Sequence, residues 1–196
     1  VVGYTIYDPM NYLDENGKLV GYDTELAEKV FGNLGYEVSF KEIVWENKYT
    51  DLNSNVIDCI WNGMSVNPSR AEQMNLSDPY MKNAMVFAVP ADSEAKTMAD
   101  LSGKIIGVQN GSTAQEILEG SEIAGTITVQ AMATNIEALQ QMELGIVDAV
   151  FLDSVVANYE ITSMGKDYVV LPDGLEEEEY AIGFRKNDQK LRDEVQ

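Results

Sequence analysis

The sequence predicts an α/β protein built as two lobes, and three observations point to this fold. Short apolar strands alternate with amphipathic helices along the chain, a pattern typical of mostly parallel sheets with helices on both faces. A polar stretch from Pro90 to Thr97 interrupts the alternation once, as a linker would. The 196 residues are enough for two small domains, each with its own core.

The elements before the linker follow the order β-α-β-α-β. Strands are predicted at residues 1–7, 36–44 and 57–66, helices at 23–34 and 47–55, and an extended segment at 86–89. Asp23 is the predicted N-cap of the first helix and Gly35 its stop, because these residue types favour those positions. This series predicts the first lobe.

A second series follows the linker. Its predicted strands cover residues 104–109, 126–131, 149–152, 168–171 and 180–185, and its helices 112–118, 135–144, 155–164 and 189–195. The glutamates Glu176–Glu179 are expected to form a solvated loop. We therefore predict a periplasmic-binding-protein-like arrangement of lobe 1 at residues 1–89 plus 182–196 and lobe 2 at 90–181. Two hinge strands would join the lobes, and small molecules bind in the clefts of such folds.

Composition excludes several classes of function. The formal charge of −20 repels nucleic-acid phosphates and anionic lipid headgroups, so we expect no nucleic-acid partner. The chain has no histidine and one cysteine, Cys59, which removes the commonest metal ligand, any intrachain disulfide and any thiolate cluster. We therefore expect no metal and no cofactor, and no apolar run approaches the ~20 residues of a membrane helix.

Arg70 is the basic residue whose position favours a ligand role. It follows an apolar strand and the segment Asn62–Ser69, so a planar cation lies at the carboxyl end of the sheet. Its guanidinium can hold a carboxylate with two parallel hydrogen bonds. An ion pair with Glu72 or Asp78 that stabilises the loop is an equally good interpretation of the residues alone.

Two further segments carry polar groups at strand ends. Gln109–Thr113 joins a strand to a helix, and its backbone N–H groups and hydroxyls favour an anion, although a plain Ser112 N-cap is the simpler interpretation. Asp153 ends an apolar strand, where it would either receive an ammonium group or cap the following helix. Tyr7 and Trp45 also lie at strand ends, where aromatic rings can enclose a ligand, whereas Trp61 and Cys59 are expected in the core.

Taken together, these segments resemble a known family. The matching segments are residues 17–23, 58–70, 76–80, 100–104, 107–113 and 145–149, in order and over essentially the whole chain. The chain is similar to the extracytoplasmic solute-binding proteins of ABC transporters for polar amino acids, family 3 type. The resemblance implies a non-enzymatic protein that binds a free amino acid between closing lobes and delivers it to a membrane permease, from the periplasm or from a lipid anchor at the outer face of the cell membrane.

The resemblance also implies roles for individual residues. Arg70 would grip the α-carboxylate with help from Ser65 and the Gly63 backbone, and Ser112 and Thr113 would add donors from the second lobe. Asp153 would take the α-ammonium, Tyr7 and Trp45 would enclose the side chain, and Asn62 and Asn11 would bond a polar, neutral one. Thr5 stands where many relatives have an acid, which weakens the case for a lysine- or arginine-type ligand.

Alternatives with the same resemblance are a ligand-sensing domain of a receptor and a cyclohexadienyl-dehydratase-like enzyme on the same fold. The absence of histidine argues against the enzyme, which needs a general acid or base. The family continues for one or two helices beyond Gln196, so we expect a truncated chain whose first lobe exposes apolar surface. Such a surface would favour dimerisation or domain swapping.

Overall fold

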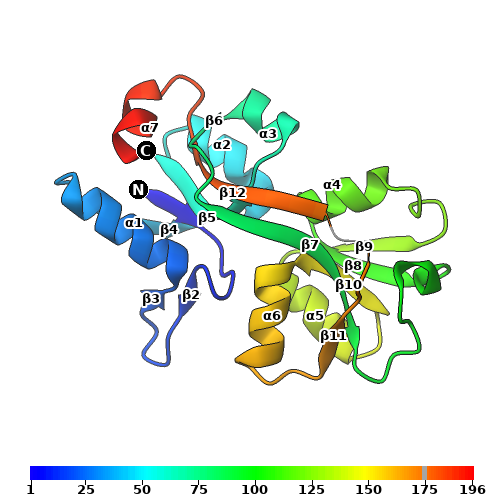
Figure 1. The fold of residues 1–196 in the computed structure, drawn as a ribbon. Helices are drawn as coiled ribbons and strands as arrows, with labels where there is room; N and C mark the ends of the chain where they lie inside the picture. The colour runs from blue at the N-terminus through cyan, green and yellow to red at the C-terminus, as the bar shows by residue number, and fades with distance from the viewer. Residues whose placement is uncertain (174–175) are drawn as a thin grey trace. The chain divides into compact units, whose positions relative to one another are not determined.

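The computed structural model describes residues 1–173 and 176–196 and has a mixed α/β architecture (Figure 1). The chain divides into two compact units, Val1–Lys82 with Glu178–Gln196, and Asn83–Glu177. Both the unit boundaries and the predicted lobe boundaries fall within strands β7 (Met81–Pro90) and β12 (Glu176–Phe184). The two-lobed arrangement itself stays a prediction.

The sheet of the first unit has the order β4-β1-β5-β12. Strand β1 (Val2–Tyr4) is parallel to both β4 (Phe40–Glu42) and β5 (Cys59–Ser65), as the β-α-β pattern predicts. Strand β12 is antiparallel to β5, and β6 (Asn75–Leu76) is antiparallel to β12. The sheet is therefore mixed rather than mostly parallel, because β12 comes from the far end of the sequence. A separate hairpin pairs β2 (Tyr12–Leu13) with β3 (Leu19–Val20).

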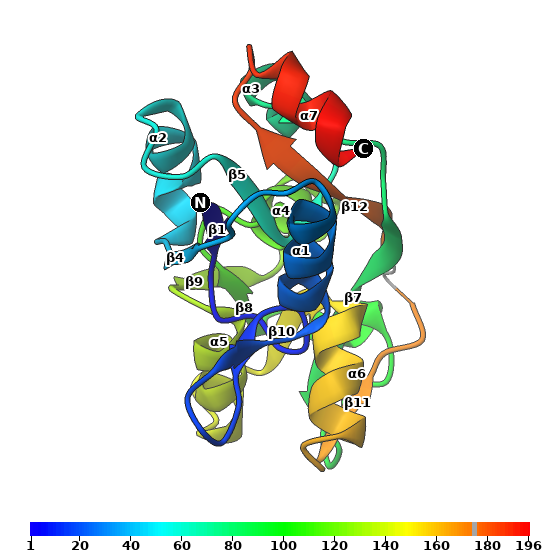
Figure 2. The same cartoon turned by 90° about the vertical axis from the view of Figure 1, so that its left-hand side faces the viewer.

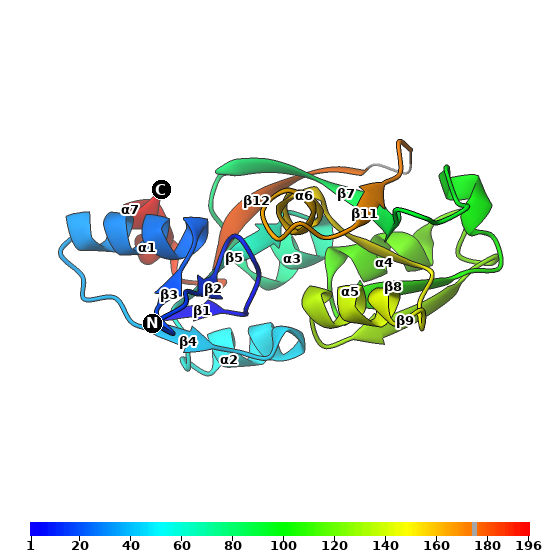
Figure 3. The same ribbon diagram turned by 90° about the horizontal axis from the view of Figure 1, so that it is seen from below.

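Helices cover both faces of this sheet. They are α1 (Tyr22–Asn33), η1 (Trp45–Asn47), α2 (Lys48–Asn53), α3 (Pro68–Gln73) and α7 (Gln189–Val195). Helix α1 packs on the sheet (Figure 2), where Phe31 joins Cys59 and Trp61 in one core cluster. Ile60 and Met64 join Leu52 of α2 in a second cluster on the opposite face (Figure 3). Side chains of β5 thus alternate between two cores, which requires a strand buried on both faces.

The second unit repeats the same principle with different strands. Its sheet has the order β7-β10-β8-β9, and β8 (Ile105–Gln109), β9 (Thr128–Met132) and β10 (Ala149–Asp153) are parallel. Strand β7 is antiparallel to β10 and to β11 (Tyr168–Val170). The helices are η2 (Met98–Leu101), α4 (Thr113–Gly120), α5 (Asn135–Glu143) and α6 (Ser154–Thr162). These elements agree with the predicted ones to within a few residues.

Two local predictions are wrong. The segment Glu176–Glu179 begins strand β12 instead of forming a loop. Val66 donates a backbone hydrogen bond to the Glu179 carbonyl (2.7 Å), and Glu177 and Glu179 are exposed. Alternate side chains of a strand point to opposite faces, so a run of acids is compatible with strand structure.

The second wrong prediction is the cap of α1. The helix begins after Gly21, and Asp23 lies in its first turn with its side chain fully buried. Gly35, by contrast, follows the end of this helix with a φ of +81°, in agreement with its predicted stop. Among the helices of residues 1–173 and 176–196, none has the length and apolar character needed to cross a membrane.

Candidate functional site

Arg70 lies on α3 as a buried cation. Asn67 caps this helix by accepting a hydrogen bond from the Arg70 backbone N–H (2.7 Å), and Pro68 occupies the first turn. The Arg70 side chain belongs to a residue only 2% exposed, and its Nη1 donates to the Ser65 carbonyl (2.8 Å). Within the described residues, its Nε has no hydrogen-bond partner and no carboxylate forms an ion pair with it. A buried guanidinium without a counter-ion is costly, so this site is suited to an anionic group.

The other two arginines are ion-paired. Arg185 pairs with Asp58 (3.0 Å) and Asp188 (3.1 Å). Arg192 pairs with Asp78 (2.8 Å), which excludes the alternative in which Asp78 neutralises Arg70. Arg70 therefore differs from the other two arginines, because it has no acidic partner in the described part of the chain.

Trp45 lies beside Arg70. Its indole is buried in η1, and the Arg70 Cζ lies 5.5 Å from the centre of the ring. The Nζ of Lys48, a buried residue that sequence reasoning missed, lies 4.9 Å from the same ring centre and donates to the Trp45 carbonyl (3.3 Å). The spacing Trp-x-x-Lys was the available signal, because residues three apart share a helix face. Two protein cations thus interact with this indole.

The two predicted amides are bound to other groups of the first unit. Asn62 Oδ1 accepts from the backbone N–H (3.0 Å) and hydroxyl (2.8 Å) of Thr5, and its Nδ2 donates to the Thr5 carbonyl (3.1 Å) and to Asn11 Oδ1 (2.6 Å). Asn11 Nδ2 in turn donates to Thr24 Oγ1 (3.0 Å). An amide has two acceptor sites and two donors, so Asn62 is fully used by the protein.

Tyr7 and Gly63 are in close contact. The Tyr7 hydroxyl is 3.1 Å from that of Tyr180. Gly63 has a φ of +52°, and a Cβ placed there would lie 2.5 Å from Cε1 of Tyr7. Only glycine fits this position, because it lacks the Cβ that both the backbone conformation and the Tyr7 ring exclude.

Asp23 is the residue of this region that the N-cap interpretation missed. Its carboxylate accepts hydrogen bonds from the Gly63 backbone N–H (2.6 Å) and the Tyr80 hydroxyl (2.9 Å to each oxygen). Burial raises the pKa of Asp23 to about 7, against the opposing effect of these hydrogen bonds. The Gly63 N–H, predicted to assist the ligand carboxylate, is therefore donated to Asp23.

In the second unit, Ser112 and Thr113 begin α4. Ser112 is the N-cap and accepts from the Gln115 backbone N–H (3.2 Å), so the capping interpretation is confirmed. The buried Thr113 Oγ1 has no hydrogen-bond partner among the residues that the structure describes. An orphaned buried hydroxyl at the start of a helix favours a ligand that accepts a hydrogen bond.

Asp153 ends β10, but its side chain makes no capping hydrogen bond to α6. Asn83 performs that task, since its Oδ1 accepts from the Ser154 hydroxyl (3.0 Å) and more weakly from the Val155 N–H (3.4 Å). Asn83 Nδ2 donates to Asp153 Oδ1 (2.7 Å). The buried carboxylate is thus oriented by Asn83, which sequence reasoning also missed, because the two residues are 70 positions apart.

Trp61 and Cys59 belong to the core, as predicted. Trp61 packs edge-on against Phe31, and burial raises the pKa of the Cys59 thiol to about 12.

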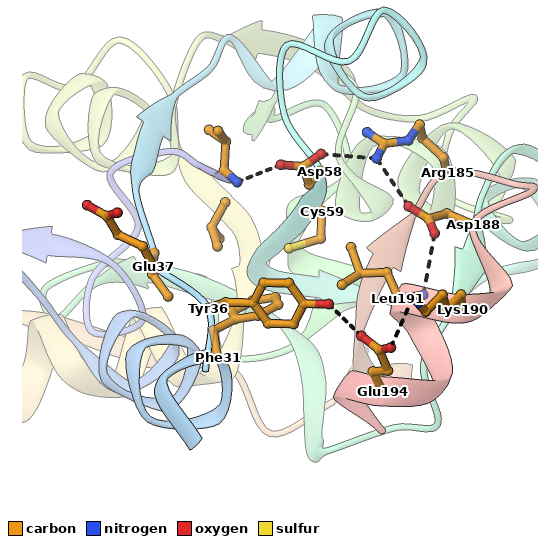
Figure 4. Close-up of a pocket in the computed structure, with 13 residues that line it drawn as sticks. Phe31, Tyr36, Glu37, Asp58, Cys59, Arg185, Asp188, Lys190, Leu191 and Glu194 are labelled. Carbon is orange, nitrogen blue, oxygen red and sulfur yellow. Dashed lines mark hydrogen bonds and ion pairs between the residues drawn. The ribbon is translucent and has the colours of Figure 1, made fainter. Parts of the chain in front are cut away.

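Two cavities of the structure lie away from the predicted site residues. One of about 340 Å³ in the first unit lies between the end of α1 and α7 (Figure 4), and one of about 560 Å³ lies in the second unit. None of the predicted site residues lines either cavity. In residues 1–173 and 176–196, no cluster of acids or cysteine is arranged to hold a metal ion.

The chain is similar to known amino-acid-binding proteins. The chain is 31% identical over 191 residues to the arginine-binding extracellular protein ArtP of Bacillus subtilis, with 95% of this chain and 73% of that protein covered. It is 30% identical to the L-cystine-binding protein TcyA of the same organism, covering 96% and 70%. A crystal structure of an ABC uptake transporter substrate-binding protein from Streptococcus pneumoniae with bound histidine matches with a TM-score of 0.95 and 33% identity, covering 99% and 82%.

The family model of the bacterial extracellular solute-binding proteins, family 3, matches residues 1–196. Because this match spans the whole chain, and the relatives align over nearly all of it, the chain belongs to family 3 of the bacterial extracellular solute-binding proteins.

Proposed function

We propose that this protein binds a free amino acid in its zwitterionic form for an ABC uptake transporter. The observation that carries the proposal is the buried Arg70 guanidinium, which has no acidic partner among the described residues. An α-carboxylate would supply the missing charge with two charge-assisted hydrogen bonds. The relatives are named as binders of arginine and cystine, and a solved one holds histidine; these molecules share the α-carboxylate and α-ammonium groups.

The second unit supplies groups that suit the rest of the ligand backbone. The orphaned Thr113 hydroxyl would donate to the carboxylate, and Asp153, oriented by Asn83, would accept from the ammonium. We infer that the two units act as lobes that close on the ligand, so that cation and carboxylate meet opposite ends of a dipolar molecule. Hinge closure of this kind is the usual way in which two-lobed binding proteins enclose their ligands.

The remaining predicted residues would act mainly as walls of the site. Asn62 is saturated by other protein groups, and Asn11 bonds to Asn62 and Thr24, so we assign both to positioning rather than direct contact. Two cations already lie over the Trp45 ring. We therefore favour a polar, neutral ligand side chain over a cationic one, while the net charge of −20 disfavours acidic amino acids at long range.

The delivery partner follows from the family. An ABC-transporter permease would receive the amino acid from this protein on the outer side of the membrane, in the periplasm or beside a lipid anchor. The relatives carry the names of binding proteins, not of enzymes, so binding and release without chemistry are the whole of the proposed activity.

Calorimetry with L-glutamine, L-histidine, L-cystine and L-arginine tests the proposal. The wild-type protein should bind at least one of them, and Arg70→Met should lose about 3 kcal/mol or more of binding free energy, at least about 100-fold in Kd. Arg192→Met is the matched control, because it removes a surface-paired arginine of the same unit and should leave affinity within about twofold of wild type. Wild-type affinity in a folded Arg70→Met protein would refute the role of Arg70, and no binding of any amino acid would refute the function.

A further inference from the structure

The segment Gly21-Tyr22-Asp23 has no ligand contact in the proposed function, yet it holds the loop that carries Tyr7 and Asn11. The backbone N–H groups of Tyr22 and Asp23 donate to the carbonyls of Pro9 (3.1 Å) and Met10 (2.9 Å). A Cβ at Gly21, where φ is +121°, would lie 2.4 Å from the Met10 carbonyl oxygen. The start of α1 therefore docks directly on this loop, and only glycine permits the close approach.

The Asp23 side chain connects the start of α1 to β5 as well. Strands β5 and β12 change register between two pairs, Ala181 with Met64 and Gly183 with Ile60. Three residues of β5, Trp61 to Gly63, thus oppose the single residue Ile182. A bulge of this kind leaves backbone groups without a strand partner, and the Gly63 N–H is donated to Asp23 instead (2.6 Å).

A buried carboxylate is energetically costly if Asp23 serves only as a structural hydrogen-bond acceptor. The residue is 0% exposed, and among the described residues no cation pairs with its carboxylate; its contacts are the Gly63 N–H and the Tyr80 hydroxyl. Both contacts are donors, and only an ionised carboxylate accepts from both without offering a hydrogen of its own. An uncharged acceptor would avoid the cost of burying a charge, which points to a role for the ionised form.

We propose that Asp23 is a positioning residue for the amino-acid site, whose ionised carboxylate holds the bulge at Gly63 and, through it, the ring of Tyr7 and the neighbouring Asn62 in the arrangement that binds ligand. This inference rests on the proposed function and deepens it. The Tyr7 ring packs against the glycine that Asp23 holds, and Asn62 precedes that glycine. Asp23 itself would not contact the ligand.

The proposal makes affinity depend on pH. Among the described groups packed against Asp23, the titratable one is the Tyr80 hydroxyl. Burial raises the pKa of Tyr80, and Tyr22 in turn raises it further through its charge. Burial raises the pKa of Asp23 to about 7, so the carboxylate is protonated as the solution becomes mildly acidic. When Asp23 is protonated, its own hydrogen faces the Gly63 N–H and the Tyr80 hydroxyl, which are themselves donors. We expect the arrangement that binds ligand then to be only a minor fraction of the protein population.

Binding of L-glutamine and of L-arginine, measured by calorimetry between about pH 5.5 and about pH 8, tests this, because both ligands keep an ionised α-carboxylate and a predominantly protonated α-ammonium over that range. Wild-type affinity should fall about tenfold or more from about pH 8 to about pH 5.5, as the competent fraction falls. Asp23→Asn should bind about tenfold more weakly than wild type at about pH 8 and show a flat pH profile. Glu25→Gln, an exposed acid on the same helix, is the matched control and should follow wild type. Parallel profiles for wild type and Asp23→Asn, or equal affinity at about pH 8, would overturn the proposal.

A measurement without ligand separates this proposal from the proposed function. Amide hydrogen exchange in residues 7–11 and 61–65 should be faster in Asp23→Ala and in Asp23→Asn than in wild type and Glu25→Gln. Unchanged exchange in both variants would overturn the positioning role even if amino acids bind. Faster exchange in a protein that binds no amino acid would support the anchorage while refuting the binding function.

Discussion

Replacing Asp23 by asparagine should make the protein more stable at neutral and alkaline pH. The carboxyl group is fully buried, and burial raises its pKa from 3.8 to about 7. In the unfolded chain the same group titrates near its ordinary value. Between these two values the folded state therefore binds the proton that the unfolded state has released, and folding stability falls as the pH rises.

The magnitude follows from the size of the shift. A rise from 3.8 to about 7 is about three pKa units, and each unit corresponds to about 1.4 kcal/mol, so the ionised group costs the folded state up to about 4 kcal/mol above pH 7. Below about pH 4 the cost vanishes, because Asp23 is protonated in both states. Asparagine resembles the protonated form and carries no such cost at any pH.

Urea unfolding of wild type and Asp23→Asn at about pH 5 and about pH 8 measures the effect. The difference in unfolding free energy should favour the variant by a few kcal/mol at about pH 8 and shrink at about pH 5. Taking the difference between two proteins cancels the contributions of the other acids, and Glu25→Gln controls for the lost charge. A variant that is less stable than wild type by the same amount at both pH values would refute the reasoning. A more stable variant that binds amino acids more weakly would show that the buried charge is kept for function at the expense of stability.

Three further predictions concern individual side chains. Thr113→Val should weaken amino-acid binding about fivefold in calorimetry without lowering the melting temperature, because the buried hydroxyl has no partner in the described part of the ligand-free protein; a clear loss of stability would show that Thr113 is a structural residue. Gly63→Ala should lose about 2 kcal/mol of stability in urea and most of its affinity, since its Cβ would lie 2.5 Å from the Tyr7 ring at a φ of +52°, and near wild-type values in both assays would contradict the assigned packing. Cys59 should react with a thiol reagent only after denaturant unfolds the protein, because it is buried and its pKa is raised to about 12; fast labelling of the native protein would count against its core position.

The sequence by itself determined the α/β class and most of the elements. Alternation of apolar strands with amphipathic helices is a local property, and the helix at residues 189–195 and the strand at 149–153 follow such local patterns closely. The sequence also indicated Arg70 as a candidate, because an arginine beyond a buried strand in a chain with three arginines is a compositional and positional signal, but it left an ion pair with Glu72 or Asp78 equally open. Local patterns predicted these features because helix and strand periodicity depends on residues a few positions apart.

Only the tertiary structure decided which polar groups pair with one another. Asp23 resembled a helix N-cap in the sequence, but it is the partner of Gly63, 40 positions away. Asp153 could have been a cap as well, but Asn83 caps α6 and orients Asp153 from 70 positions away. The register shift between β5 and β12 likewise arises from segments far apart in the chain. Side-chain pairing and strand register are long-range properties: they depend on which elements meet in the folded protein, and no pattern within a single element encodes that meeting.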